Sequence, residues 1–236
     1  MNKFILPTAI ICIIILMSTM LQMSKNQSST QDNTLNILDT ITLPDPDHSS
    51  SLSIETVLQE RRSIRDYHDR PLTLSEVSQL LWAAQGVTHP GGYRTAPSAG
   101  ALYPLEVYIL AGEVNDLPAG TYKYKPHAHE LELITKGDAR LELCDAALDQ
   151  SCIKEGAAVI VFCAVYERTT QKYGERGIRY VHMEVGHAAQ NIYLQAVSLN
   201  LGTVVIGAFH DDEVKQIVNM TDEEQPLYIM PVGGIR

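Results

Sequence analysis

The chain has 236 residues and a mass of 26.1 kDa, which is room for one domain or at most a domain and a half. An apolar fraction of 45% and a charged fraction of 19% exclude a wholly disordered or low-complexity chain. The formal net charge of -10 argues against nonspecific nucleic-acid binding, because that function needs a basic surface.

Residues 1–23 are predicted to form a hydrophobic membrane anchor or a signal segment. Residues 4–23 carry no charge, and a helix of this length spans about 30 Å, the thickness of a bilayer core. The apolar run is longer than a usual signal peptide and no clear cleavage site follows it, which favours an uncleaved anchor. Lys3 favours a domain on the extracytoplasmic side; a secreted domain or one on the cytoplasmic face stays open.

Residues 24–53 are rich in Ser, Thr, Asn, Asp and Gln and contain Pro44 and Pro46. This composition predicts a polar linker. The globular domain is therefore expected at residues 54–236, which is enough chain to bury a single core.

Hydrophobic periodicity predicts the elements of this domain. In chain order they are a helix at 54–62, a helix from a capping box at 73–76 to Gly86, a strand at 105–111, two short strands around a turn near 126–129, a strand at 157–165, a helix at 180–200, a strand at 203–206, a helix at 211–219 and a strand at 227–232. The unbroken apolar run 157–165 indicates a central strand buried on both faces. Helices and strands alternate irregularly, which indicates an α+β fold.

Two segments carry candidate binding chemistry. Residues 61–65 read Arg-Arg-Ser-Ile-Arg, and three guanidiniums with a hydroxyl can surround a phosphate dianion. The alternative is a solvated, charged helix end, or arginines that satisfy the carbonyl groups at the C-terminus of the helix. Residues 96–104 form a small-residue loop between two prolines, where backbone amides can approach a ligand closely, unless the loop is only structural. Neither a Rossmann nor a Walker motif is present.

These two segments, together with residues 186–191 (Gly-His-Ala-Ala-Gln-Asn) on the long helix, resemble the nitroreductase-like flavoproteins. The resemblance is closest to the SagB-type dehydrogenases, relatives of the flavin oxidases that convert azolines to azoles in modified peptides. It covers nearly all of residues 54–236. It implies a nitroreductase-like α+β fold with a mixed central sheet flanked by helices, and a homodimer with FMN at the subunit interface.

The resemblance also implies which residues bind FMN. The ribityl phosphate would be held by Arg61, Arg62, Ser63, Arg65 and the C-terminal Arg236. The isoalloxazine ring would contact Pro97, Ser98, Ala99, Gly100 and Ala101, from the other subunit, together with Val185, Gly186, Ile206 and Gly207. Close helix packing is the structural alternative for the glycine at position 186.

Lys172 and Tyr173 resemble the Lys-Tyr pair of the SagB-type enzymes and are the candidate catalytic residues. In azoline oxidation a base must remove a proton as hydride leaves for the flavin, and a lysine, or a tyrosine beside a cation, can do that. The alternative is an exposed, charged lid over the pocket.

Other polar residues are not assigned to a site. His127 and His129 have no third ligand nearby, and His182, Glu184 and His187 do not follow the order of a metalloprotease helix, so no metal is expected. The four cysteines lack CxxC or Cys/His spacing; Cys144 and Cys152 could pair if the domain is exported, but the sequence does not place them close together.

The function expected from these features is that of an FMN-dependent oxidoreductase working by ping-pong two-electron transfer. A SagB-type dehydrogenase of azoline-like or other organic substrates is favoured by Lys172 and Tyr173. One alternative is a nitro or quinone reductase that uses NAD(P)H. Another is a membrane-tethered flavin-binding or docking module without turnover. The substrate and the electron donor stay open.

Overall fold

The computed structural model of the chain describes residues 40–235. The predicted anchor at residues 1–23 therefore lies outside the described residues, as do the first part of the predicted linker and Arg236. Within residues 40–235 no helix is long and apolar enough to cross a membrane.

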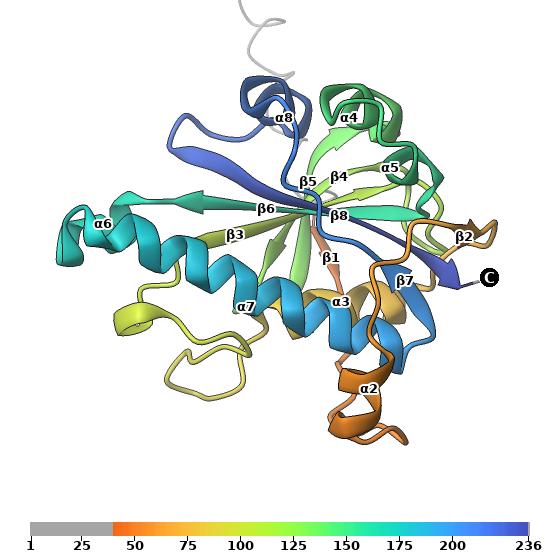
Figure 1. Cartoon of the computed structure of the whole chain (residues 1–236), viewed down its shortest axis with the longest axis horizontal. Helices are drawn as coiled ribbons and strands as arrows, with labels where there is room; N and C mark the ends of the chain where they lie inside the picture. The colour runs from red at the N-terminus through yellow and green to blue at the C-terminus, as the bar shows by residue number, and fades with distance from the viewer. Residues whose placement is uncertain (1–39, 236) are drawn as a thin grey trace, which may run out of the picture. The chain divides into compact units, whose positions relative to one another are not determined.

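A sheet runs through the middle of the domain (Figure 1). Its strand order is β1-β5-β4-β3-β6-β8-β2, and β7 pairs with β8 outside this path. The strands are β1 (Thr40–Thr42), β2 (Tyr67–His68), β3 (Leu105–Ala111), β4 (Gly120–Lys125), β5 (Glu130–Lys136), β6 (Ala158–Val165), β7 (Leu201–Thr203) and β8 (Glu224–Ile235). The sequence predicted a sheet of mixed strand directions, whereas the pairings between these strands are all antiparallel.

Helices cover both faces of the sheet (Figure 1). They are α2 (Ile54–Glu60), α3 (Leu74–Gln85), the short 3-10 helix η1 (Ala99–Ala101), α4 (Arg140–Ala146), α5 (Cys152–Glu155), α6 (Glu167–Tyr173), α7 (Arg176–Ser198) and α8 (Asp211–Val218). On one face α3 and α7 pack together, and on the other face lie α4, α5 and α8. The α+β prediction is confirmed.

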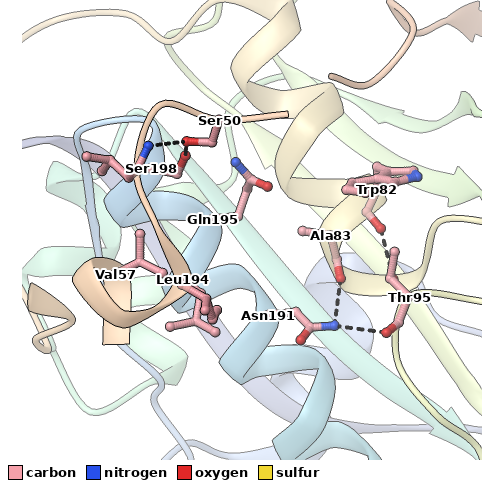
Figure 2. A pocket seen from close by; sticks show the side chains of 11 residues that line it. Ser50, Val57, Trp82, Ala83, Thr95, Asn191, Leu194, Gln195 and Ser198 are labelled. Atoms are coloured by element: carbon pink, nitrogen blue, oxygen red, sulfur yellow. Dashed lines mark hydrogen bonds between the residues drawn. The ribbon is translucent and has the colours of Figure 1, made fainter. Parts of the chain in front are cut away.

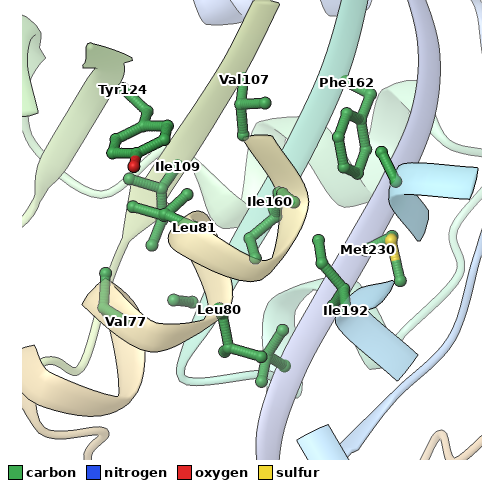
Figure 3. Packing of buried hydrophobic residues seen from close by; sticks show 14 of the residues in the cluster. Val77, Leu80, Leu81, Val107, Ile109, Tyr124, Ile160, Phe162, Ile192 and Met230 are labelled. Carbon is green, nitrogen blue, oxygen red and sulfur yellow. The ribbon is translucent and has the colours of Figure 1, made fainter. Parts of the chain in front are cut away.

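Strand β6 connects the two layers of core, because its side chains alternate between them. Ile160 and Phe162 belong to the cluster formed with α3 and α7, which Figure 3 shows with Leu81 of α3 and Ile192 of α7. Val159 belongs to the cluster on the face of α4, α5 and α8. Every residue of β6 is buried, so the prediction of a central strand buried on both faces is confirmed.

The folded domain begins earlier than the predicted boundary at residue 54. Strand β1 pairs with β5, and Leu43, which follows β1, is buried in the main core. Asp47 and Gln79 of α3 exchange two hydrogen bonds: the backbone N–H of Asp47 donates to the Gln79 side chain, whose amide donates back to the Asp47 carbonyl. Residues 40–53 are therefore part of the domain and not a linker, and a strand of three residues was too short for periodicity to reveal.

Other element bounds also differ from the predictions. The last strand, predicted at 227–232, extends over 224–235 as β8. Helix α7 begins at Arg176, four residues earlier than predicted, because its first turn carries charged residues that interrupt the apolar pattern. The strand predicted at 203–206 is β7 at 201–203, after which Ile206 forms an isolated bridge with Ile229. The helices α4, α5 and α6 were not predicted, and all three are short.

A buried ion pair joins β4 to the start of β8. The Glu224 side chain is 1% exposed, and its carboxylate accepts hydrogen bonds from the Lys123 ammonium at 2.5 Å and the Tyr108 hydroxyl at 2.9 Å. Burial works to raise the pKa of Glu224, but the hydrogen bonds from Lys123, the Thr221 backbone and Tyr108 outweigh it and lower that pKa.

We expect Lys123→Met to lower the free energy of unfolding by about 3–5 kcal/mol, because it leaves Glu224 as an uncompensated buried charge. Urea denaturation measures the change. The matched control is Lys125→Met, which removes the exposed pair with Glu132 and should cost less than about 1 kcal/mol. Equal losses in the two variants would contradict the buried-charge account.

Candidate active site

The loop at 97–101 lies directly against the end of α6. Gly100 has a φ of +65°, a conformation that residues with side chains rarely adopt. A Cβ atom at this position would lie 2.8 Å from the Nζ atom of Lys172 and 2.8 Å from the hydroxyl oxygen of Tyr173. A side chain at position 100 would therefore displace the ends of the Lys172 and Tyr173 side chains. The structure therefore brings together two site segments that the sequence analysis identified separately.

The loop is held in place by hydrogen bonds to its backbone. The N–H of Ala99 donates to the Glu184 carboxylate of α7 at 2.8 Å. The Ser98 hydroxyl accepts the N–H of Tyr103 at 2.9 Å, and the N–H of Ala101 donates to the Ser98 carbonyl at 3.0 Å. These bonds fix the predicted ring-contacting residues in one conformation.

Glu184 is a site residue that the sequence analysis missed. It is 4% exposed, and burial raises its pKa, against which the Ala99 N–H and the Ser98 hydroxyl act. The signal was present in the sequence: Val181, Val185 and Ala188 form an apolar stripe with helical spacing, and Glu184 is the charged residue within it. The sequence analysis considered this glutamate only as a metal ligand.

A cavity of about 270 Å³ lies between the loop and α7. Its lining residues are Pro97, Ser98, Ala99, Tyr180, Met183, Glu184 and His187. Tyr180 packs edge-on against Tyr173, with 5.2 Å between the ring centres, so the cavity borders the Lys172–Tyr173 pair. Apolar walls with one carboxylate and one imidazole suit a small organic ring.

The two predicted ring contacts of α7 face different surroundings. Val185 is 3% exposed and its side chain packs in the main core. Gly186 is exposed, and a Cβ atom there would meet nothing within 4 Å. Close packing inside the domain therefore does not explain this glycine, and the surface beside it is open to a flat ligand.

The arginine segment 61–65 docks near the other end of α7. The N–H of Ile64 donates to the Thr203 carbonyl at 2.9 Å, which fixes the segment on β7. Ser63 and Tyr193 share a hydrogen bond of 3.0 Å, and the Arg61 guanidinium lies 5.1 Å from the centre of the Tyr193 ring. The exposed side chains of this segment stay available to an anion.

The five predicted phosphate ligands are not equivalent. Arg62 donates from one nitrogen to the carbonyls of Gln59 and Arg61, each at 2.8 Å, so it ends the helix as the structural alternative expected. Arg65 is exposed. Arg236 lies outside the described residues, but Ile235 before it pairs with Tyr67, which follows the arginine segment closely.

The structure does not bring the two groups of predicted cofactor ligands together within one chain. The loop lies beside Tyr180 and Glu184, whereas the arginine segment contacts Tyr193. Thirteen residues of helix separate Tyr180 from Tyr193, which is about 20 Å along the axis. Ile206 is buried in its bridge with Ile229, and the exposed Gly207 faces the Tyr228 ring.

A second cavity, of about 320 Å³, lies between α2, α3 and α7 (Figure 2). Asn191 of the predicted motif at 186–191 points between α3 and the following loop, where its amide donates to the carbonyls of Ala83 and Thr95. Trp82 lines the same cavity. Asn191 therefore has a structural role, which ties α7 to the segment that leads into the loop.

His129, His182 and the described cysteines serve packing or hydrogen bonding. Across residues 40–235 no group of three or more metal-ligating side chains is close enough to hold a metal ion. His129 bonds to Ser78 and Tyr124, and His182 bonds to Tyr166. The cysteines of the described part, at 144, 152 and 163, are buried thiols without a disulfide.

Comparison with known proteins places this site in a family. Residues 58–234 match the nitroreductase family. The protein MJ1384 of Methanocaldococcus jannaschii, which is named as a nitroreductase, is 50% identical over 193 residues, which is 82% of this chain and 95% of that protein.

Two further similarities are to proteins of microcin B17 processing. The microcin B17-processing protein McbC of Escherichia coli is 30% identical over 171 residues, which is 70% of this chain and 63% of that protein. The solved E. coli microcin synthetase McbBCD complex, with truncated pro-MccB17 bound, contains a chain that matches with a TM-score of 0.64 and 26% identity. That match covers 83% of this chain and 78% of the other.

We expect Gly100→Ala to abolish most turnover, because its Cβ atom displaces Lys172 and Tyr173 in addition to straining the backbone. Gly137→Ala is the matched control, since Gly137 also has a positive φ, of +102°, but a Cβ atom there meets nothing within 4 Å. Both variants should lose about 1–2 kcal/mol of stability in urea unfolding. Turnover that falls equally in both would show that the contact at Gly100 is unimportant.

We expect Glu184→Gln to change how stability depends on pH. A carboxyl with a raised folded-state pKa contributes stability that is fully present below its unfolded pKa and is lost as the pH rises through the folded value. The glutamine variant cannot ionise and so does not lose this stability. Its melting temperature should therefore rise relative to that of the parent as the pH rises above about 4.5. Thermal melts of both proteins, with the exposed Glu142→Gln as control, measure the effect; parallel curves would refute it.

Proposed function

Because the chain belongs to the nitroreductase family of oxidoreductases, we propose that it is an FMN-dependent dehydrogenase of SagB type. It takes hydride from an azoline-like or other organic substrate in a ping-pong reaction. The observation that carries the proposal is the contact of Lys172 and Tyr173 with Gly100. The similarity to the microcin B17-processing protein supports the same reading.

The residues of the two predicted binding groups suit FMN. Arg61 and Arg65 offer guanidinium groups for a phosphate dianion, which a chain with a net charge of -10 would otherwise repel. The open surface at Gly186 leaves room for a flat ring. When bound, FMN would accept the hydride and pass it to a second substrate.

Either the neutral amine of Lys172, or the Tyr173 phenolate beside the Lys172 cation, would take the proton that the substrate loses as the hydride leaves. The Lys172 side-chain nitrogen lies 5.4 Å from the centre of the Tyr173 ring. When Lys172 is charged, it is therefore a cation beside the phenol, and both groups lie against Gly100 of the loop. Tyr180 and Met183 form apolar walls of the adjoining cavity, against which an organic substrate could pack.

The second candidate is a nitro or quinone reductase that uses NAD(P)H as its electron donor. The observation that favours it is the 50% identity with a protein named as a nitroreductase. The two candidates share the FMN site and differ in the first substrate, so the response of bound flavin separates them.

The active form is a homodimer in this proposal. The loop 97–101 of one copy would meet the FMN whose phosphate is held by the arginine segment 61–65 of the other. A homodimer accounts for the distance between these two groups along α7, which one chain does not bridge. The segment 1–23 would tether the enzyme to a membrane, with the domain on the extracytoplasmic side.

The chain shortened to begin at residue 40 is the protein to test, because β1 is part of the fold. The proposal expects it to bind FMN and to be bleached under argon by a thiazoline-containing peptide. Bleaching by NADPH and not by the peptide would favour the reductase. A protein that cannot be loaded with FMN would contradict both candidates.

We expect Lys172→Met to keep FMN bound but to slow reduction by the peptide roughly 100-fold or more, because it removes either the proton acceptor itself or the cation beside Tyr173. Stopped-flow absorbance measures the rate, and dialysis measures FMN retention. Lys125→Met, which removes an exposed cation of β4 outside the site, should react at the parent rate. An unchanged rate for Lys172→Met would refute its role as the base.

A further inference from the structure

We propose that Arg168 is a positioning residue of this active site. By joining Glu106 of β3 to the backbone of Tyr103, it holds α6 so that Lys172 and Tyr173 lie against the loop 97–101. This inference rests on the proposed function of the Lys172–Tyr173 pair.

Arg168 makes two directed contacts from one guanidinium. One terminal nitrogen pairs with the Glu106 carboxylate at 2.5 Å, and the other donates to the Tyr103 carbonyl at 3.1 Å. A planar guanidinium group that is bound through two of its nitrogens has a fixed position and a fixed orientation. Lys172 follows Arg168 by four residues on α6, so the two side chains share one face of the helix.

Tyr103 supports the loop at the same time. Its N–H donates to the Ser98 hydroxyl at 2.9 Å, inside the loop. Its own hydroxyl accepts the N–H of Arg94 at 3.2 Å, and the Arg94 guanidinium lies 4.5 Å from the centre of its ring. Its φ is +47°, so a sharp bend of the chain is held by contacts on several sides. Arg168 therefore connects the helix of the catalytic pair to the residue that anchors the loop.

Glu106 is in turn fixed to the sheet. Lys123 of β4 lies 3.3 Å from its carboxylate and also binds the buried Glu224 of β8. The carboxylates of Glu106 and Glu224 and the cations of Lys123 and Arg168 thus form a cluster in which the charges balance. Removal of Arg168 leaves Glu106 paired with Lys123, so we expect the variant to fold and its effect to remain local.

The test compares Arg168→Gln, Glu106→Gln and the double variant with the parent, all loaded with FMN. Each single variant should slow peptide oxidation roughly 10- to 100-fold with FMN retained, because small misplacements of catalytic groups have effects of this size. The double variant should be no slower than Arg168→Gln alone, since that single variant already removes the ion pair with Glu106. In Arg168→Lys the single ammonium group can pair with Glu106 but cannot also bind the Tyr103 carbonyl in a fixed geometry. Its rate should therefore lie between those of Arg168→Gln and the parent.

Hydrogen exchange supplies a readout that does not depend on turnover. We expect faster amide exchange in both 97–103 and 167–174 of Arg168→Gln, with the rest of the domain unchanged. The control Lys125→Gln, which breaks an exposed ion pair, should alter neither segment.

Unchanged exchange in these two segments would overturn the proposal whatever the enzyme's function is. Faster exchange with parent turnover, while Lys172→Met loses turnover, would overturn the positioning role and leave the proposed function intact. Full turnover in Lys172→Met would defeat both, because the pair held by Arg168 would then have no part in the reaction.

Discussion

The candidate site depends on a close approach between two segments. A Cβ atom at Gly100 of the loop would lie 2.8 Å from the Nζ atom of Lys172 and from the Tyr173 hydroxyl, and the positive φ of Gly100 already favours glycine. A side chain at this position would therefore displace Lys172 and Tyr173, the proposed catalytic pair. The other contacts of the site, from Glu184 on α7 to Arg168 on α6, hold the two sides of this approach in place.

The sheet supplies the rigidity behind this contact. Strand β6 is buried on both faces, and only Tyr166 separates its last residue from α6. Figure 1 shows α6 beside this end of β6. The charge cluster around Lys123 ties β4, β3 and β8 together below that end of the sheet. Because these ion pairs are buried, the loss of one partner leaves an uncompensated charge. The cluster that stabilises the sheet also contains Glu106, which fixes Arg168 of α6.

Elements with a strong local pattern were predictable from the sequence. The capping box of Thr73 and Glu76 begins α3 as expected, because both reciprocal hydrogen bonds form. The strand at 105–111 was predicted at its observed bounds, since its alternation lies between turn signals. The short elements β1, α4, α5 and α6 were missed because they are too short for periodicity to reveal and are stabilised by packing on distant partners.

For the site, the sequence identified the segments but not their contacts. Lys172 and the loop each stood out by residue type, whereas their approach at Gly100 depends on how α6 packs. Glu184 was undervalued because its partner, the N–H of Ala99, belongs to a distant loop. Arg62 was grouped with the phosphate ligands, although its carbonyl contacts show a helix-ending role that residue type alone does not reveal.

The central claim is that each active site combines the arginine segment of one copy with the loop and Lys172 of another. Subunit exchange between an Arg65→Ala protein and a Lys172→Met protein tests it most directly. If the claim holds, the mixed dimer contains one intact site, and a random mixture should recover about a quarter of the parent turnover. A mixture that shows only the summed residual turnover of the two variants would contradict the account.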